Sequence, residues 1–321
     1  MKNQKKIMLV FGTRPEAIKM APVVHRLKSE PDYFDVSVCV TAQHREMLDQ
    51  VLKIFELKPD IDLNIMKPSQ DLFDVTATIL LGMQDVFKKS KPDAILVHGD
   101  TTTTLATSLA GFYAEIPIAH IEAGLRTHNI LSPFPEEFNR QVAGKVAKWH
   151  FAPTELSKKN LINEGIPGKN ITVTGNTVID SLYWMLDRIE SDNTRSSRIK
   201  ESINKVITFD WLSEQFVLIT GHRRENFGDG FFQICKALRE LASRFQDKHF
   251  LYPVHLNPNV QIPVNNILSD LPNVHLIEPL EYEPFIYLLK HCYFVLTDSG
   301  GIQEEAPSLG KPVLVMREVT E

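Results

Sequence analysis

Four ionisable residues are placed where catalytic groups of α/β enzymes are commonly found. Asp100, Glu122 and His222 each lie within three residues of the end of an apolar, strand-like run, and Glu136 lies in a proline-containing loop. Because the carboxyl ends of parallel strands meet at one edge of a sheet, these groups are expected to gather there. Three carboxylates and a histidine suit general acid–base catalysis, in which protons move on and off a substrate.

Structural roles and a metal site are the alternatives for these residues. Asp100 could cap the helix that follows it, and His222 could be a hydrogen-bonded loop histidine. The pairs His98-x-Asp100 and His120-x-Glu122 resemble metal ligands, but residues i and i+2 share one face in any strand. The helical His-Glu-x-x-His motif of zinc enzymes is absent from the sequence. We therefore expect no metal.

A glycine turn near the N-terminus predicts an anion site. The segment Gly12-Thr13-Arg14-Pro15-Glu16 follows a strand-like run, and Thr13 and Glu16 have the spacing of a capping box, which predicts a helix start. Free N–H groups and the helix dipole attract anions at such a start, and Arg14 and Lys19 add positive charge. The structural alternative is an ordinary capped helix with solvated basic residues.

A second glycine turn predicts nucleotide binding in the other half of the chain. In the segment Thr297-Asp298-Ser299-Gly300-Gly301, two glycines after a strand-like run allow backbone N–H groups to approach a phosphate closely. Glu305 follows within the next helix, where a carboxylate can accept hydrogen bonds from ribose hydroxyls. Neither the Walker A motif nor the Gly-x-Gly-x-x-Gly motif is present, so the common ATP and NAD motifs are excluded.

Strand-like and helical patterns alternate along the whole chain, which predicts βα units and parallel sheets in an α/β fold. Strands are expected at residues 7–11, 36–41, 94–97, 116–121, 150–152, 171–173, 216–220, 249–253, 274–277, 294–297 and 313–316. Helices are expected at residues 17–29, 44–55, 101–114, 231–245 and 285–291.

Length and one polar stretch predict two domains. At 321 residues the chain exceeds the size of one ordinary core. Residues 187–205 are charged and poor in large apolar groups, which predicts a linker with some helix. We predict an N-terminal domain of residues 1–185 and a nucleotide-binding domain of residues 186–321. Two open sheets facing each other would bind a ligand in the cleft at the ends of their strands.

Composition limits the partners. The formal net charge of −5 provides no overall positive field for nucleic acid or for anionic lipid. Cys39, Cys235 and Cys292 lie singly in apolar stretches, which is typical of reduced core thiols in a cytoplasmic protein. No apolar stretch approaches the roughly 20 residues of a membrane span, and the short run after the N-terminal lysines does not fit a signal peptide.

Five motifs occur in collinear order over the whole chain. They are Gly12-Thr13-Arg14-Pro15-Glu16-Ala17, His98-Gly99-Asp100-Thr101, Ile121-Glu122-Ala123-Gly124-Leu125-Arg126, Gly221-His222-Arg223-Arg224-Glu225-Asn226 and Thr297-Asp298-Ser299-Gly300-Gly301-Ile302-Gln303-Glu304-Glu305. Together they resemble the motifs of the non-hydrolysing UDP-N-acetylglucosamine (UDP-GlcNAc) 2-epimerases.

The resemblance implies two Rossmann-like domains facing across a cleft, as in the glycosyltransferase-B-like fold. It implies interconversion of UDP-GlcNAc with UDP-N-acetylmannosamine (UDP-ManNAc) by elimination of UDP to 2-acetamidoglucal and re-addition of UDP. That chemistry consumes no metal and no nicotinamide, and it serves polysaccharide biosynthesis. The resemblance also implies a homodimer.

The resemblance also assigns roles to residues. The implied catalytic set is Asp100, Glu122, Glu136 and His222. Arg14 and Lys19 are implied diphosphate contacts, Phe285, Ser299, Gly300 and Gly301 are implied uridine and phosphate contacts, and Glu305 is implied at the ribose. Gln43, His44, Arg223 and His255 are implied at a regulatory site for a second, activating UDP-GlcNAc, although the segment around Gln43 equally fits a helix start with polar residues outward.

One departure from the family is expected to matter. The chain stops at Glu321, where the family continues with an Arg-Pro-Glu segment and further helices, so a truncated product is expected. Three alternative functions follow from the same pattern: a glycosyltransferase of the same architecture, a hydrolysing epimerase that releases free UDP, and a catalytically silent UDP-sugar-binding protein.

Overall fold

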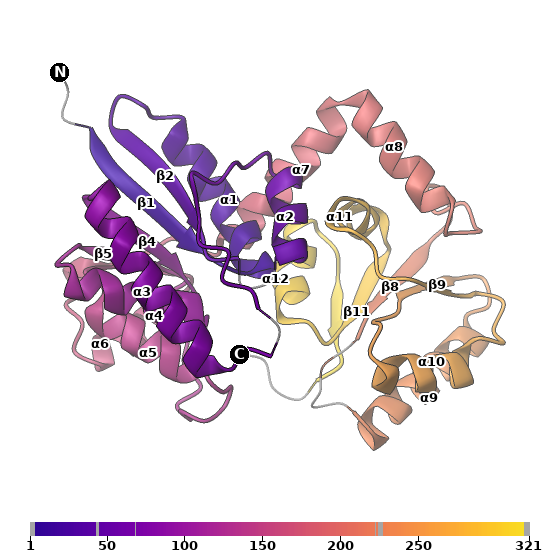
Figure 1. Cartoon of the computed structure of the whole chain (residues 1–321). Coiled ribbons are helices and arrows are strands. Elements are labelled where there is room, and N and C mark those ends of the chain that lie inside the picture. The colour runs from indigo at the N-terminus through magenta and orange to yellow at the C-terminus, as the bar shows by residue number, and fades with distance from the viewer. Residues whose placement is uncertain (1–3, 43–44, 68, 222, 224–226, 318–321) are drawn as a thin grey trace. The chain divides into compact units, whose positions relative to one another are not determined.

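The computed structural model of the chain describes residues 4–42, 45–67, 69–221, 223 and 227–317. The chain divides into two compact units between Ser181 and Leu182, and each unit contains one parallel β-sheet. Figure 1 follows the chain from indigo at the N-terminus to yellow at the C-terminus. We call the two parts unit 1 and unit 2 and describe each by itself.

Unit 1 alternates strands with helices throughout. Its strands are β1 (Lys5–Phe11), β2 (Phe34–Val40), β3 (Ile61–Asp62), β4 (Ala94–His98), β5 (Ile118–Ile121), β6 (Trp149–Ala152) and β7 (Ile171–Val173). Its helices are α1 (Arg14–Lys28), α2 (Arg45–Ile54), α3 (Leu72–Ser90), α4 (Thr102–Tyr113), α5 (Glu136–Val146) and α6 (Glu155–Asn163), and a single 3₁₀ turn spans Gly168–Asn170. Helix α7 (Thr177–Ser191) begins in unit 1 and continues into unit 2.

The seven strands of unit 1 lie in the order β3-β2-β1-β4-β5-β6-β7, and every pair is parallel. The strand order therefore reverses between β1 and β4, where successive connections leave in opposite directions. In open α/β sheets, ligands bind at this position, beyond the carboxyl ends of the strands. Gly12 follows β1 and Gly99 follows β4, so two of the predicted motifs meet at this point.

Alternating side chains bury both faces of this sheet. Met8 and Val10 of β1 belong to a core that also contains Ile79 and Met83 of α3 and Ala106 of α4, so these two helices cover one face. Helix α1 contacts β1 and β2, and its buried side chains are Glu16, Ala17, Met20, Ala21 and Val24. Because both faces are covered, the strands consist of nearly continuous apolar residues, as is usual for parallel sheets.

Unit 2 repeats the architecture with a smaller sheet. Its strands are β8 (Phe216–Thr220), β9 (His249–Pro253), β10 (Val274–Ile277), β11 (Phe294–Thr297) and β12 (Val313–Val315), and its helices are α8 (Asn193–Asn204), α9 (Asp229–Arg244), α10 (Pro258–Leu268), α11 (Tyr282–His291) and α12 (Gly300–Ser308). The order β10-β9-β8-β11-β12 reverses between β8 and β11. Residues Gly221 and Asp298, each in a predicted motif, follow these two strands directly.

The structure confirms the predicted strands, with ends within two residues, and adds the short β3. The helix expected within residues 187–205 is confirmed, but the linker is wrong, because those residues form the end of α7 and nearly all of α8. Asp192 caps α8 by accepting hydrogen bonds from the backbone N–H groups of Thr194 and Arg195. Ile199 and Ile203 bury the inner side of α8, so the charged residues that suggested a linker are its solvent-facing side.

The three cysteines are free and buried, as predicted from their apolar surroundings. Among the residues that the structure describes, no helix combines the length and the apolar character needed to cross a membrane.

We predict that Gly12→Ala strongly destabilises unit 1. A Cβ atom at residue 12 would overlap the hydroxyl oxygens of Thr41 and Thr103, both fully buried and hydrogen-bonded to each other at 2.9 Å. Overpacking of this kind costs about 1–3 kcal/mol, which lowers the midpoint of thermal unfolding by several degrees. The control is Gly230→Ala in α9, where a Cβ atom meets nothing within 4 Å. An unchanged midpoint for Gly12→Ala would contradict the close packing of this turn.

Candidate active site

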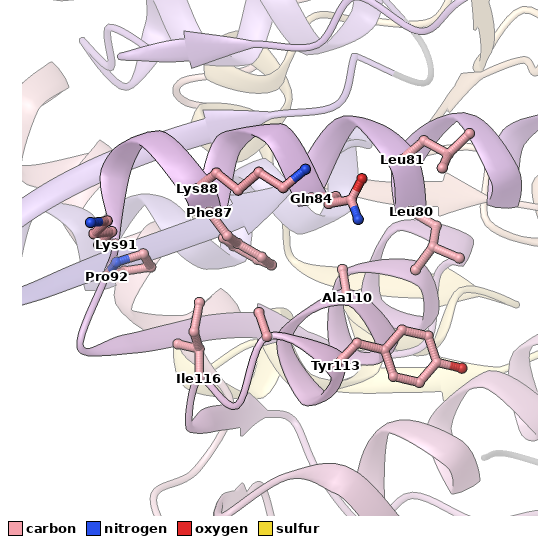
Figure 2. A pocket seen from close by; sticks show the side chains of 11 residues that line it. Leu80, Leu81, Gln84, Phe87, Lys88, Lys91, Pro92, Ala110, Tyr113 and Ile116 are labelled. Atoms are coloured by element: carbon pink, nitrogen blue, oxygen red, sulfur yellow. The ribbon is translucent and has the colours of Figure 1, made fainter.

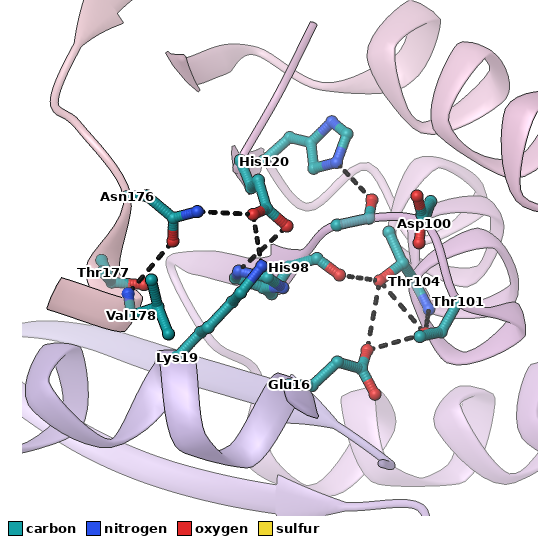
Figure 3. A network of polar contacts seen from close by, with 12 residues as sticks. Glu16, Lys19, His98, Asp100, Thr101, Thr104, His120, Asn176, Thr177 and Val178 are labelled. Carbon is teal, nitrogen blue, oxygen red and sulfur yellow. Dashed lines mark hydrogen bonds and ion pairs between the residues drawn. The ribbon is translucent and has the colours of Figure 1, made fainter. Parts of the chain in front are cut away.

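The carboxylate of Glu122 is the centre of a polar cluster in unit 1, near the position where the strand order reverses. Lys19 of α1 donates a hydrogen bond to its Oε1 and forms an ion pair with it, and Asn176 Nδ2 donates to the same oxygen at 3.1 Å. His98 Nε2 faces the other oxygen, Oε2, at 3.5 Å. Figure 3 shows the side chains of Lys19, His98 and Asn176 pointing toward one another from three different segments.

Local backbone geometry places the Glu122 carboxylate in this cluster. Glu122 follows β5 directly and has a positive φ of 62°, which is uncommon for a residue with a side chain. Gly99 N donates to the carbonyl of Ile121 at 2.9 Å, which joins the ends of β4 and β5. A Cβ atom on Gly99 would lie 3.4 Å from Glu122 Oε2, so the absence of a side chain there leaves room for the carboxylate.

The pKa values of Glu122 and Asp100 are shifted in opposite directions. Burial acts to raise the pKa of Glu122, but the facing His98 and the ion pair with Lys19 outweigh burial, and the pKa is lowered. Burial raises the pKa of Asp100 to about 6, and the nearby carboxylates of Glu122 and Glu136 add to this rise while Arg140 opposes it. Two carboxyl groups at one site whose pKa values are shifted apart can act as a base and an acid.

Helix α5 holds Asp100 in place. Arg140 Nη2 lies 2.7 Å from Asp100 Oδ2, and Asn139 Nδ2 donates to the Asp100 carbonyl at 2.8 Å. Glu136, the first residue of α5, is near enough to influence the pKa of Asp100. The structure therefore brings Asp100, Glu122 and Glu136 of the predicted catalytic set together. His222, the fourth member, lies outside the described residues.

The two buried histidines of β5 and β6, His120 and His150, make no hydrogen bond to Glu122 in the described part of the chain. His120 Nε2 lies 2.7 Å from the carbonyl of Gly99 and therefore carries the proton. Burial lowers the pKa of His120 to about 3 and also lowers that of His150. Among the described residues, no group of three or more His, Cys, Asp or Glu side chains is arranged to hold a metal ion.

The start of α1 differs from the predicted anion site. Gly12 N and Thr13 N donate to Oε2 of the buried Glu16 at 2.9 and 2.8 Å, so these N–H groups are not free. Thr101 donates to Glu16 Oε1 at 2.7 Å, and burial raises the pKa of Glu16 despite these bonds. The N–H groups of Gly12 and Thr13 are therefore bonded within the protein, and Lys19 is paired with Glu122.

Arg126, the last residue of the Glu122 motif, has a structural role. Its side chain is fully buried, and two of its nitrogens contact the two carboxylate oxygens of Glu164 at 2.6 and 2.8 Å. The paired contact connects the loop after β5 to the end of α6. The same loop is held by Glu137, which accepts a hydrogen bond from Thr127 N at 3.1 Å.

In unit 2, the start of α12 retains the character of an anion site. Its N-cap residue, Ser299, makes no side-chain cap, and Gly300 and Gly301 form the first turn. A Cβ atom on Gly300 would lie 3.9 Å from the guanidinium of Arg223, and one on Gly301 would lie 3.9 Å from Glu305 Oε2. Arg223 N donates to Asp298 Oδ2 at 2.9 Å, which fixes this residue next to α12.

The remaining predicted residues that the structure describes lie in unit 2. Phe285 lies partly exposed in the first half of α11, and His255 is exposed after β9, where its Nδ1 accepts from Asn257 N at 3.1 Å. Arg223, predicted as regulatory, lies beside the glycine turn of α12 and so joins the predicted phosphate contacts. Gln43 and His44 lie outside the described residues.

Sequence analysis did not assign a function to Asn176, Arg140 or the side chain of His98. Two signals were available. His98 and Asn176 each stand at or just beyond the end of a strand, and Arg140 lies one helical turn after Glu136, on the helix that the loop motif begins. Asn176 and His98 lie 54 and 24 residues from Glu122 along the chain, and Arg140 lies 40 residues from Asp100, so these pairings are visible only in the folded structure.

Comparison with known proteins gives one consistent result. The family model described as UDP-N-acetylglucosamine 2-epimerase matches residues 25–321. The UDP-N-acetylglucosamine 2-epimerase of Salmonella typhimurium strain LT2 is 58% identical over 98% of this chain and 83% of its own length. The crystal structure of the UDP-GlcNAc 2-epimerase from Neisseria meningitidis bound to UDP-GlcNAc superposes with a TM-score of 0.88 at 53% identity, covering 98% of this chain and 83% of that one.

A more distant solved structure agrees. The UDP-GlcNAc 2-epimerase from Methanocaldococcus jannaschii in complex with UDP-GlcNAc and UDP has a TM-score of 0.78 and 31% identity, with 98% of this chain and 84% of that chain covered.

We predict that Arg140→Gln raises the pKa of Asp100 further above 6. The guanidinium stabilises the ionised carboxylate, so its removal favours the protonated form. Carbon-13 NMR of aspartate carboxyl groups checks this, with the signal assigned by its loss in Asp100→Asn. Lys145→Gln, on the same helix but bonded to the Glu164 carbonyl, is the control and leaves the titration unchanged. A pKa of Asp100 that stays the same in Arg140→Gln would show that Arg140 does not stabilise the ionised carboxylate.

Proposed function

The chain belongs to the UDP-N-acetylglucosamine 2-epimerase family, and from this premise we propose how its residues catalyse the reaction. The protein is an isomerase with the glycosyltransferase-B-like fold of that family. Its substrates are UDP-GlcNAc and UDP-ManNAc, which differ in configuration at C2 of the sugar.

One observation supports the catalytic proposal above the others. Two carboxyl groups at the same sheet edge, Glu122 and Asp100, have pKa values shifted in opposite directions. Inversion at C2 requires a base on one face of the sugar and an acid on the other. An ionised Glu122 suits the base, and an Asp100 with a pKa of about 6 suits the acid.

The proposed chemistry balances as an elimination followed by an addition. Glu122 takes the proton from C2, the C–H electron pair forms the C1=C2 double bond, and the C1–O bond breaks so that UDP leaves with its bonding pair. Asp100 then returns a proton to C2 from the opposite face, while an oxygen of UDP adds back to C1. The intermediate is 2-acetamidoglucal. The negative charge of Glu136 helps to raise the pKa of Asp100 and so favours its protonated form.

The departing UDP needs positive charge where its negative charge develops. In unit 2 the uncapped start of α12 offers backbone N–H groups at Gly300 and Gly301, and Arg223 adds a guanidinium beside them. Glu305 is buried next to Gly301 and is proposed to accept hydrogen bonds from the ribose. In unit 1, Arg14 and Lys19 are proposed to add positive charge for the diphosphate.

We expect the protein in D₂O to convert UDP-GlcNAc into UDP-ManNAc with deuterium at C2 of the product. Glu122→Gln should slow this exchange by at least about 10²-fold, because a general base contributes roughly that factor or more. Nuclear magnetic resonance of C2 and the thermal midpoint of each variant are the measurements. Glu155→Gln, at the exposed start of α6, is the matched control.

Release of UDP or transfer of the sugar without deuterium at C2 would contradict the proposal and favour hydrolysis or glycosyl transfer. Tight UDP binding with no turnover would favour a silent binding protein.

We further propose that the protein is a homodimer that pairs through helices α3 and α4. A hollow of about 570 Å³ lies there, lined mainly by apolar side chains such as Leu80, Phe87 and Tyr113 (Figure 2). Leu81 and Tyr113 are 64% and 70% exposed, which is unusual for large apolar side chains grouped together.

Charge supports pairing with a second copy of the chain. Helix α3 has acidic residues, Asp71 and Asp74, at its start and basic residues, Lys88 and Lys89, in its last turn. Two copies of α3 packed antiparallel about a twofold axis would bring the acidic end of each against the basic end of the other.

The dimer proposal predicts that Leu81→Asp yields monomers, because it buries an unpaired charge in the proposed contact. Light scattering after size-exclusion chromatography measures the mass. Leu156→Asp, at a residue of α6 that is 68% exposed, is the control and should leave the dimer intact. A wild-type monomer, or a dimeric Leu81→Asp variant, would exclude this surface.

The regulatory proposal is narrower than the sequence suggested. A second UDP-GlcNAc is proposed to act as an activator, and His255 of unit 2 is kept as a proposed contact. Arg223 is assigned instead to the phosphates at α12, because its guanidinium lies beside Gly300.

A further inference from the structure

His98 is a buried histidine whose side chain has no function in the reaction as described so far. It ends β4, is 3% exposed, and its Nε2 makes no hydrogen bond of ordinary geometry among the described residues. That nitrogen faces Glu122 Oε2 at 3.5 Å. A buried polar atom without a regular partner is uncommon in folded proteins and calls for an explanation.

The charge state of His98 limits what it can do. Burial lowers the pKa of His98 to about 4, with Glu122 opposing and Lys19 adding to that decrease. At neutral pH the ring is therefore uncharged and holds one proton. If that proton were on Nδ1, the lone pair of Nε2 would face the carboxylate lone pairs and repel them. The tautomer with the proton on Nε2 is favoured, and it makes His98 a donor to Glu122.

The two oxygens of the Glu122 carboxylate have different surroundings. Oε1 accepts from both Lys19 and Asn176, and Lys19 brings a full positive charge. Oε2 faces only the neutral ring of His98 and the open space left by Gly99 among the contacts described. Because Oε2 is less strongly bound, it is the oxygen better able to take a proton from a substrate.

We propose that His98 is a positioning residue for the reaction: its Nε2–H directs Oε2 of Glu122 toward the substrate and favours the ionised carboxylate. This inference rests on the proposed function, in which Glu122 removes the C2 proton. The 3.5 Å separation fits a structure without substrate, because catalytic hydrogen bonds commonly shorten when the substrate binds.

The other groups that face Glu122 cannot replace this contact. Lys19 is committed to Oε1, and Asp100 is itself a carboxyl group. His120 of β5 donates to the Gly99 carbonyl, so its proton points away from Glu122. The donor on the Oε2 side is therefore His98.

The backbone of His98 is held independently of its ring. Thr104 Oγ1 donates to the His98 carbonyl at 2.5 Å, and the β4–β5 register pairs His98 with Ile121. A substitution at residue 98 can therefore remove the ring while the strand end stays in place. This separation makes two variants informative: His98→Gln, which can present an N–H near the position of Nε2, and His98→Leu, which cannot.

The test measures kcat and KM for epimerisation, together with deuterium incorporation at C2, across pH. His98→Leu is expected to lower kcat by about 10- to 100-fold, as expected for the loss of one hydrogen bond to a charged group, with little change in KM. Loss of the donor raises the pKa of Glu122, so the acidic limb of the kcat profile moves to higher pH. His98→Gln is expected to recover most of kcat and the wild-type limb.

His150→Leu is the matched control, since His150 is equally buried on β6 and makes no contact with Glu122 in the described part of the chain. It is expected to leave the acidic limb unchanged. The inference is overturned if the His98→Leu limb does not move, or if His98→Gln is as impaired as His98→Leu, since either result means that the ring only fills space. Absence of deuterium at C2 with the wild-type protein would instead overturn the proposed function itself.

Discussion

The burial of one ionised carboxylate, Glu122, is the constraint on which unit 1 depends. A charge taken out of water must be paired and hydrogen-bonded, or it becomes protonated. Lys19 from α1, Asn176 from the start of α7 and His98 from β4 meet this requirement together. The Glu122 carboxylate, which is also the proposed catalytic base, therefore connects α1, β4 and the segment before α7.

Glu16 shows the opposite solution at the same sheet edge. It is buried among backbone N–H groups and threonine hydroxyls and has no cation beside it in the contacts described, so its pKa is raised. Its hydrogen bonds close the glycine turn after β1 and tie α1 to the start of α4. The two glutamates, which follow β1 and β5, thus differ in role: Glu16 stabilises the glycine turn, and Glu122 is the proposed base.

Each unit, taken by itself, carries one kind of chemical group at the carboxyl ends of its strands. Unit 1 supplies carboxyl groups with separated pKa values, which suits proton transfer at carbon. Unit 2 supplies an uncapped helix start with glycines and a nearby guanidinium, which suits a diphosphate. In both sheets these features stand where the strand order reverses, so the topology of each unit determines where its functional residues lie.

The sequence by itself determined the α/β class and the strands, because apolar periodicity is a local property of the chain. Short motifs, which are also local, determined the family and the choice of Asp100, Glu122 and Glu136 as candidate catalytic residues. The linker expected at residues 187–205 was wrong, because the charged surface of α8 gave no sign of the buried Ile199 and Ile203, whereas the capping box of Thr13 and Glu16 was confirmed. Only the tertiary structure decided which groups are paired. Lys19 and Glu122 are 103 residues apart, and a pKa depends on neighbours in space rather than in sequence.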